Sequence, residues 1–475
     1  MSANEKLIKL YSSKLGEKKG TKRIWIESKK LHDTNFAEHL RYEPEYDFDN
    51  KRITLRPGFT NKITIREKNN MPIIDILNHN VSEIFKGFTH IVIKLFNDEI
   101  VIEPLKEEIK QGKAKARATC DKSHTLTSVE IFAGGGTLVK SLRDSGINCI
   151  AAVELEDKYL ANLEANNPDI TTYCGDLAKL DVSTLPNADI LVAGIPCSAF
   201  SNAQRTSERF EAHPTGSLGF YVLKIIDAIR PGVVLIEEVP NFKSSAIANV
   251  VRYVLDSMGY FIEETELKGS DYGSLTRRKR FCMVASMKKG FKFDDSYKKE
   301  NTRTVEDILE IPHDERTWLT RENSKSIAYS LDKEQEHIAK GEGFRLARTS
   351  IDDTVVATVT KGYFKNRLTD PILVNADDSN KFSWFTPREL ARLNGLPEDF
   401  ILEPTAKSTC GEIIGQGVCY EAFNSVGKMI VNHFHSEEYD EELVKRESFI
   451  SAVRESNVTE YEDAQLGCFM AGSLF

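Results

Sequence analysis

One cysteine stands where a chain of this kind could do nucleophilic chemistry. Cys197 lies in DILVAGIPCSAFS, residues 189–201, directly after an apolar strand and a Gly-Ile-Pro turn. Open α/β sheets bind their ligands at the carboxyl ends of their strands, so a thiol on that turn is a candidate nucleophile. A lone cysteine after a buried strand is more often plain packing, because a free thiol behaves as a small apolar group. The neighbouring motifs must decide between the two interpretations.

Two adjacent carboxylates end another apolar strand. The segment GVVLIEEVPNF is apolar until Glu237 and Glu238. A partly desolvated acid must be paired or protonated, so this pair is a candidate for acid–base work, with a surface-facing strand end as the alternative. The basic run at residues 277–280 precedes one more apolar strand. We expect at least one of its arginines to point back toward the strand ends.

A glycine-rich turn indicates a nucleotide-like ligand. TSVEIFAGGGTLVKSLRDSG predicts a strand, a turn at residues 134–136 and a helix, and such glycines let the backbone approach a ligand at the helix N-terminus. The next strand ends in Glu154, 20 residues beyond Gly134, which is the spacing at which an acid reaches ribose hydroxyls. A third strand leads to Asp176. Three such strand ends in sequence favour one adenosine pocket.

Alternating strands and helices from residue 127 onward predict an α/β sheet core. Short β-branched runs between about residues 50 and 105 predict a small β-rich module, and we expect residues 1–30 to form a mobile basic arm. The expected organisation is an arm, β-rich domain and linker over 1–122, an α/β core from 123 onward and an acidic tail over 436–475.

Composition excludes several classes of protein. The chain has 475 residues, and its eight cysteines are scattered without CxxC or zinc spacing, so we expect no metal. No stretch approaches the roughly 18 apolar residues of a membrane span, and no secretory signal opens the chain. We expect a cytoplasmic monomer. The net charge of -9 argues against unspecific coating of nucleic acid, although residues 1–123 carry about +6 by count.

Six short blocks then point to one family. They are FAGGG (132–136), IPCSAFS (195–201), EEV (237–239), TRRKR (276–280), FTPRELARLNGLPEDF (385–400) and GQGV (415–418). In order and approximate distance they resemble the sequence blocks of the cytosine-5 DNA methyltransferases. The resemblance covers most of residues 127–430 and leaves out the first 120 and the last 40 residues.

The resemblance implies a Rossmann-like, seven-stranded methyltransferase core over 123–295, a small target-recognition region over 296–380 and the C-terminal part of the catalytic domain over 381–435. The β-rich domain within 1–122 would be an accessory domain. It implies S-adenosylmethionine as methyl donor, double-stranded DNA as substrate and a cognate restriction endonuclease as a candidate partner. Cys197 would add to C6 of a flipped cytosine, Glu237 would act at N3 and the exocyclic amine, and Arg280 would contact O2, with Arg278 as the other arginine of that block. The cofactor-binding residues that it implies are Phe132, Ala133, Gly134, Gly135, Gly136, Thr137, Glu154, Asp176, Pro196, Gln416 and Val418.

Several positions depart from the family pattern and suggest a divergent branch. Thr137 replaces the last glycine of the first block and should tighten the turn, and Glu238 replaces an asparagine, which leaves open which glutamate faces the base. Ser198, Thr276 and Gln416 replace a glutamine, a glutamine and an asparagine. None of these changes removes a reacting group.

Two other functions fit the same residues. An RNA cytosine-5 methyltransferase acting on tRNA uses the same catalytic set, and its recognition region is expected to be short, as it is here. A catalytically silent DNA-binding regulator could retain the cofactor fold, although the Pro-Cys, Glu and Arg set speaks against it.

Overall fold

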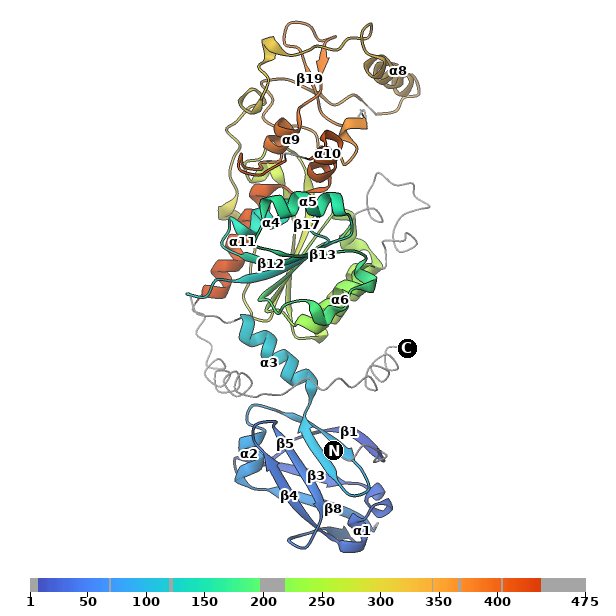
Figure 1. Ribbon diagram of the computed structural model, residues 1–475, viewed down its shortest axis with the longest axis vertical. Helices are drawn as coiled ribbons and strands as arrows, with labels where there is room; N and C mark the ends of the chain where they lie inside the picture. The colour runs from blue at the N-terminus through green and yellow to red at the C-terminus, as the bar shows by residue number, and fades with distance from the viewer. Residues whose placement is uncertain are drawn as a thin grey trace. The chain divides into compact units, whose positions relative to one another are not determined.

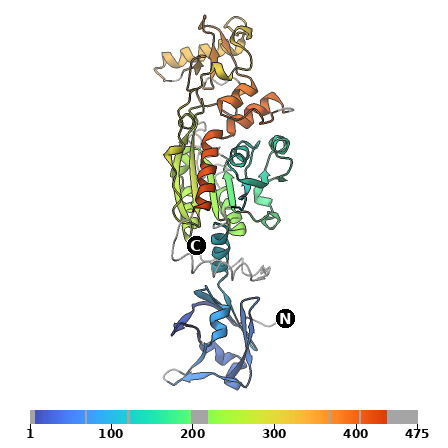
Figure 2. The same cartoon turned by 90° about the vertical axis from the view of Figure 1, so that its left-hand side faces the viewer.

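The computed structural model describes residues 7–67, 70–118, 123–196, 218–343, 345–365, 369–402 and 405–436. The chain folds as two compact units, the first containing the described residues up to Ala116 and the second spanning Arg117–Ser436. Figures 1 and 2 show the elements of each unit.

The first unit is built from two antiparallel sheets with strand orders β1-β9-β10-β5-β4-β6 and β2-β3-β8-β7. Its core contains mainly isoleucine, leucine and phenylalanine side chains from both sheets and from α2. The elements are β1 (Lys9–Lys14), β2 (Gly16–Lys18), β3 (Thr21–Glu27), α1 (Phe36–His39), β4 (Arg41–Asp47), β5 (Arg52–Pro57), β6 (Asn61–Lys62), β7 (Thr64–Arg66), β8 (Met71–Leu77), α2 (His79–Ile84), β9 (His90–Leu95), β10 (Ile100–Pro104) and α3 (Lys106–Ala118).

The expectation of a mobile arm over residues 1–30 is wrong for residues 9–27, which form β1, β2 and β3. Strand β1 pairs antiparallel with β9, from Lys9 opposite Leu95 onward. In β3 the fully buried Ile24 and Ile26 alternate with more exposed residues. The period of two places the isoleucines in the core while the basic side chains stay near solvent, so a basic composition alone did not indicate an unfolded arm.

The second unit contains a seven-stranded sheet of order β13-β12-β11-β14-β15-β17-β16. All neighbouring pairs from β13 to β15 are parallel, whereas β17 runs antiparallel to both β15 and β16. This topology confirms the expected Rossmann-like fold. The elements are β11 (Thr127–Ile131), α4 (Thr137–Arg143), β12 (Asn148–Glu154), α5 (Asp157–Asn166), β13 (Thr171–Cys174), β14 (Ile190–Gly194), α6 (Leu218–Ile229), β15 (Val233–Glu238), α7 (Ala246–Ser257), β16 (Phe261–Lys268), β17 (Lys279–Ser286) and α11 (Tyr420–His435).

Helices cover both faces of this sheet. On one face α4 and α5 pack on Cys149 and Ala152 of β12, and α11 packs against α4 while its His433 contacts Ser286 of β17. Helix α6 lies on the other side of the sheet in Figure 1 and packs against α7. The strand order reverses between β11 and β14, and ligands of open α/β sheets bind at the carboxyl ends of the strands that flank such a switch point.

A second lobe of the same unit lies between β17 and α11 in sequence. Its three-stranded sheet has the order β18-β19-β20. One core joins side chains from Leu275 to Ile414, so the FTPREL block packs together with the segments before it. The elements are α8 (Lys325–Ala339), β18 (Arg348–Thr349), β19 (Ile372–Val374), β20 (Phe382–Ser383), α9 (Pro387–Leu393) and α10 (Lys407–Gln416).

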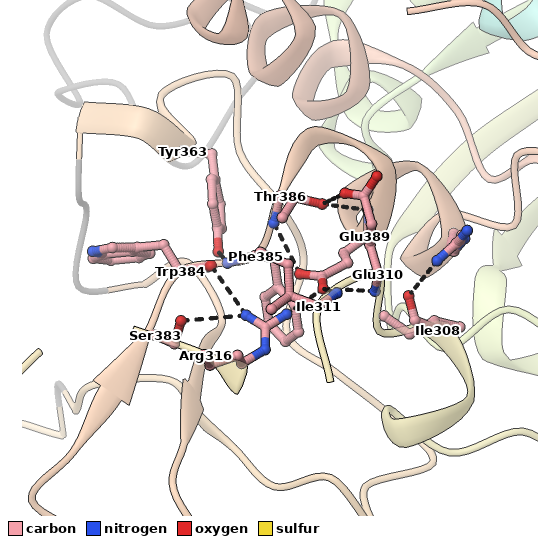
Figure 3. A network of polar contacts seen from close by, with 11 residues as sticks. Ile308, Glu310, Ile311, Arg316, Tyr363, Ser383, Trp384, Phe385, Thr386 and Glu389 are labelled. Atoms are coloured by element: carbon pink, nitrogen blue, oxygen red, sulfur yellow. Dashed lines mark hydrogen bonds and ion pairs between the residues drawn. The ribbon is translucent and has the colours of Figure 1, made fainter. Parts of the chain in front are cut away.

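A buried polar network stabilises the start of α9 in this lobe, as Figure 3 shows. The carboxylate of Glu389 forms an ion pair with Arg316 and accepts from the backbone N–H groups of Glu310 at 2.8 Å and of Thr386 at 2.9 Å. The hydroxyl of Thr386 in turn accepts from the Glu389 N–H at 3.2 Å, which completes a capping box. Such a box satisfies two otherwise unpaired donors at a helix start.

Within the described residues, no helix is both long enough and apolar enough to cross a membrane. In the same parts of the chain, no group of three or more His, Cys, Asp and Glu side chains is arranged to hold a metal ion.

Candidate active site

The turn after β11 forms the first wall of the site. Phe132, Gly134 and Gly136 all adopt positive φ, at 59°, 55° and 87°. The N–H of Ala133 donates to Val153 O at 3.1 Å, and the N–H of Gly136 donates to Ala133 O at 3.1 Å. Glycine adopts this backbone conformation without strain. The turn therefore brings the start of α4 to the carboxyl edge of the sheet at its switch point.

Glu154 fixes that turn from the end of β12. Its carboxylate accepts three backbone N–H groups, from Gly134 at 2.7 Å and from Leu155 and Glu156 at 2.9 Å each. The side chain is buried, with 8% exposure. The 20-residue spacing noted in the sequence thus brings Glu154 and the glycine turn into direct contact, and its role toward a ribose stays a prediction.

The GQGV block closes on the same turn from the far end of the chain. The N–H of Val418 donates to Thr137 Oγ1 at 3.4 Å. A Cβ placed on Gly417 would lie 2.6 Å from that oxygen, and one placed on Gly134 would lie 3.7 Å from the side-chain nitrogen of Gln416. Thr137 therefore links the FAGGG block to the GQGV block. A glycine at position 137 would have no hydroxyl to make this contact.

The other predicted positions lie along the same strand edge. Asp176 follows β13, is exposed, and accepts from the Ala178 N–H at 2.9 Å. Pro196 follows β14 and is half-buried. Cys197 and the residues after it lie outside the described residues, which resume at Leu218.

A buried ion pair lies at the ends of β15 and β17. Arg280 Nε and Glu237 Oε1 are 2.6 Å apart, and the two side chains are 10% and 9% exposed. The Oε2 atom of Glu237 lies 3.6 Å from the position that a Cβ on Gly194 would take. Burial raises the pKa of Glu237, while Arg280 and Arg278 oppose that rise. A buried carboxylate with one arginine partner can hold or release a proton in response to a ligand.

The strand register puts the two glutamates on opposite faces of the sheet, and only Glu237 shares a face with Arg280. Glu237 pairs with Gly194 on β14 and with Cys282 on β17, so it shares a face with Arg280, two residues before Cys282. Glu238 pairs with Phe281 and lies on the opposite face. Burial, the largest cause, raises the pKa of Glu238 well above its usual range, and its Oε2 accepts from the Val239 N–H.

Arg278 occupies a different environment from Arg280. It is 1% exposed and donates to the backbone carbonyls of Val359 at 2.9 Å and of Gly415 at 2.7 Å. These bonds tie the end of the sheet to the second lobe and to the GQGV block. The geometry therefore makes Arg278 a residue that positions other segments, while its predicted catalytic role stays untested.

Glu130 was not among the predicted site residues. It is the fourth of the five residues of β11, is 1% exposed, and its Oε2 has no hydrogen-bond partner among the described residues. Burial, followed by the charge of Glu237, raises the pKa of Glu130 well above its usual range. Strands of a parallel sheet read as nearly continuous apolar runs, so the acid within TSVEIF was a signal available from the sequence.

The fold and this edge define the class of protein. A parallel sheet with a reversed seventh strand, a glycine turn at the switch point and an acid at the end of the second strand form the architecture of an S-adenosylmethionine-dependent methyltransferase. The family model of C-5 cytosine-specific DNA methylases matches residues 126–432. The chain belongs to that family and is an enzyme of the DNA (cytosine-5-)-methyltransferase class.

Curated relatives agree with this assignment. The Type II methyltransferase M.DsaV of Dactylococcopsis salina is 27% identical over 326 residues, which cover 67% of this chain and 90% of the relative. The Type II methyltransferase M.HhaI of Haemophilus parahaemolyticus is 28% identical and covers 60% of this chain and 88% of its own length.

Solved structures share the fold. The Dnmt2 methyltransferase of S. pombe aligns with a TM-score of 0.53 at 19% identity, over 65% of this chain and 98% of its own. The Entamoeba histolytica methyltransferase EhMeth aligns with the same score at 18% identity and the same coverage.

Proposed function

We propose that this enzyme transfers a methyl group from S-adenosylmethionine to C5 of cytosine in double-stranded DNA, through a bond between Cys197 and C6 of a flipped base. The observation that carries the proposal is the buried Glu237–Arg280 pair, which lies beside Gly194, three residues before Cys197. A target base cannot be reached inside a duplex, so the reaction requires it to leave the stack.

The residues divide the reaction among themselves. The Cys197 thiolate adds at C6, because only the thiolate is a sufficient nucleophile. Glu237 acts at N3 and the exocyclic amine while negative charge builds on the ring, and Arg280 contacts O2. After methylation at C5, loss of the C5 proton and elimination of the thiol restore the base.

The glycine turn is the proposed donor site. Its left-handed glycines at 134 and 136 leave the backbone open to close approach, and the adjacent acids Glu154 and Asp176 are the proposed partners of ribose and adenine. When bound, S-adenosylmethionine supplies an electrophilic methyl group. The remaining proposed contacts come from the turn and from the Pro196, Gln416 and Val418 positions.

Residues 296–380 of the second lobe are the proposed recognition region. Arginine, lysine, hydroxyl and aromatic side chains are interleaved there, which suits phosphate and base-edge contacts. Because the relatives are Type II methyltransferases, the proposal includes a restriction endonuclease with the same recognition sequence as a partner. Co-expression with that endonuclease should leave host DNA uncut, whereas cutting would remove this partner.

Trapping on duplex DNA that contains 5-fluorocytosine tests the proposal directly. We expect a covalent adduct that requires S-adenosylmethionine and is absent from Cys197→Ala, which should still bind the donor. If the wild-type protein formed no adduct and Cys197→Ser behaved in the same way, the result would support a catalytically silent regulator. Labelled methyl transfer to tRNA alone, with none to duplex DNA, would replace the DNA substrate by RNA.

A further inference from the structure

Glu130 is a buried acid that the proposed reaction does not use. It lies on β11, where the other inward-facing positions are apolar or small, and it is 1% exposed. Its Oε2 accepts no hydrogen bond from any described residue. A buried carboxylate without donors is strongly destabilised, so such a group takes up a proton and becomes neutral.

The strand register puts Glu130 and Glu237 on one face of the sheet. Glu130 pairs with Val192 of β14, and Gly194, two residues further along that strand, pairs with Glu237 of β15. Positions two apart on a strand share a face. One strand, β14, therefore separates the two acids.

Gly194 places no side chain next to Glu237 on this face of β14. The Glu237 Oε2 atom lies 3.6 Å from the position of a Cβ on Gly194, and that same position lies 3.5 Å from Phe132 O at the end of β11. The Glu237 carboxyl therefore reaches over β14, while its other oxygen pairs with Arg280. No side chain at position 194 shields one acid from the other.

Few charges on this face can balance a second anion. The titratable or charged groups on the elements packed around Glu130 are Cys149 and Glu154 on β12, Glu237 and Glu238 on β15, Lys279, Arg280 and Cys282 on β17, Lys140 and Arg143 on α4, and Tyr420, Glu421, Lys428, His433 and His435 on α11, with Arg278 directly before β17. Lys140 pairs with Asp144 and Asp399, and Lys279 pairs with Glu266. Arg143 pairs with Asp169, and Arg280 already pairs with Glu237. A charge on Glu130 would thus be unbalanced and would face Glu237.

We propose that Glu130 must stay protonated, and therefore neutral, for methyl transfer to proceed, so that loss of this proton sets the alkaline limit of the reaction. The inference rests on the proposed function, in which addition of the Cys197 thiolate builds negative charge on the base. An ionised Glu130 on the same face of the sheet as Glu237 would repel the negative charge that builds on the base. The proton lost from Glu130 leaves to solvent, and no other bond changes.

The pH dependence of the single-turnover methyl-transfer rate tests the inference, in the full-length enzyme with saturating duplex DNA and donor. The wild-type rate should rise as Cys197 ionises and then fall by up to about tenfold per pH unit once Glu130 ionises. Glutamine mimics the neutral acid, so Glu130→Gln should lose the falling limb. Glu130→Asp should retain it.

Glu238→Gln is the matched control. Glu238 is equally buried, its Oε1 has no partner, and it also lies beside Glu237 in sequence, but it lies on the opposite face. This variant should keep the wild-type falling limb. A falling limb unchanged in Glu130→Gln, or lost equally in Glu238→Gln, would overturn the inference, because a packing role would lower the rate at every pH alike.

A second readout does not depend on turnover. Infrared spectra at pH 8 should contain a protonated-carboxyl band that Glu130→Gln removes and Glu237→Gln retains. Absence of that difference band would also overturn the inference. An enzyme that forms no adduct with 5-fluorocytosine DNA but shows this band would contradict the proposed function alone, and the protonation of Glu130 would stand.

Discussion

Two buried acids in the second unit differ in almost every contact. Glu389, in the second lobe, is 0% exposed and receives Arg316 together with backbone N–H groups of Glu310, Ile311 and Thr386. Glu130, in the sheet, is 1% exposed and its Oε2 receives nothing from the described residues. Burial is the same, but the number of donors is not.

The comparison separates two uses of a buried carboxyl. A carboxylate surrounded by donors fixes the segments that supply them, and the charge is kept because it is compensated. An acid without donors contributes no such cross-link and is kept neutral. Glu237 lies between the two cases, because one arginine balances it and its other oxygen lies beside Gly194.

The largest expected effect concerns Glu237. Glu237→Gln should lower the methyl-transfer rate by about 10²–10⁴, because general acid–base groups contribute on that scale. Single-turnover kinetics measure the loss, and the unfolding temperature should also fall, because the variant leaves the buried Arg280 without its anion. Glu238→Gln should be milder. If Glu238→Gln proved the more damaging variant, the side assigned to the two glutamates by the strand register would be wrong.

Glu389, which accepts several hydrogen bonds, should instead affect the stability of the fold. Glu389→Ala leaves Arg316 buried without its anion, and removing one partner of a buried pair costs about 3–5 kcal/mol. Denaturant unfolding followed in the full chain should show this loss. The double variant Arg316→Met with Glu389→Leu should recover much of it. A single variant as stable as wild type would remove the contrast between the two acids.

Arg278 should show a smaller effect on stability. Arg278→Met leaves the carbonyls of Val359 and Gly415 without their donor, and an unsatisfied buried polar group costs about 1–3 kcal/mol. We expect a lower unfolding temperature. We also expect weaker binding of S-adenosylmethionine, measured by calorimetry, since Gly415 precedes the proposed cofactor-binding residue Gln416. Arg278→Lys should retain only part of the wild-type stability and binding, because an ammonium group cannot donate to both carbonyls in the geometry of the guanidinium. A catalytic role would lower the rate without either change.

The last expected effect is small only at low pH: Glu130→Gln should gain stability relative to the wild type as the pH rises. Glu130 has a raised pKa in the folded state because of burial and Glu237, so its contribution to stability is fully present below the unfolded pKa of about 4.3 and is lost as pH rises toward the folded pKa. The wild type should lose about 1.4 kcal/mol per pH unit across that window relative to the variant. Unfolding temperatures at pH 5 and pH 8 measure the difference, and a constant difference would contradict a neutral Glu130.

Much of the strand edge could be predicted from local sequence. Apolar runs ending in glycine or an acid located the ends of β11, β12, β14 and β15, because the carboxyl ends of parallel strands meet at one edge. The spacing of Glu154 from the glycine turn predicted their proximity, and the structure joins them by a hydrogen bond. Family resemblance added the order of the blocks.

Contacts between distant segments were beyond that reasoning. Arg278 bonds to Gly415, 137 residues away, and Arg316 pairs with Glu389, 73 residues away. Neither segment has a periodicity that refers to the other, so only the packed lobe brings them together. Glu130 differs, since an acid inside a buried strand is visible in the sequence, but its lack of donors follows only from three-dimensional packing.

The turn at Phe132 has a consequence for motion. A phenylalanine with a φ of 59° occupies a region that costs an L-residue about 1–2 kcal/mol, whereas a glycine would occupy it freely. That cost lowers the energy needed to open this short segment relative to the strand before it. Backbone amides of residues 132–136 should therefore exchange their hydrogens with solvent sooner than those of β11, and a molecule that settles on the turn should slow that exchange.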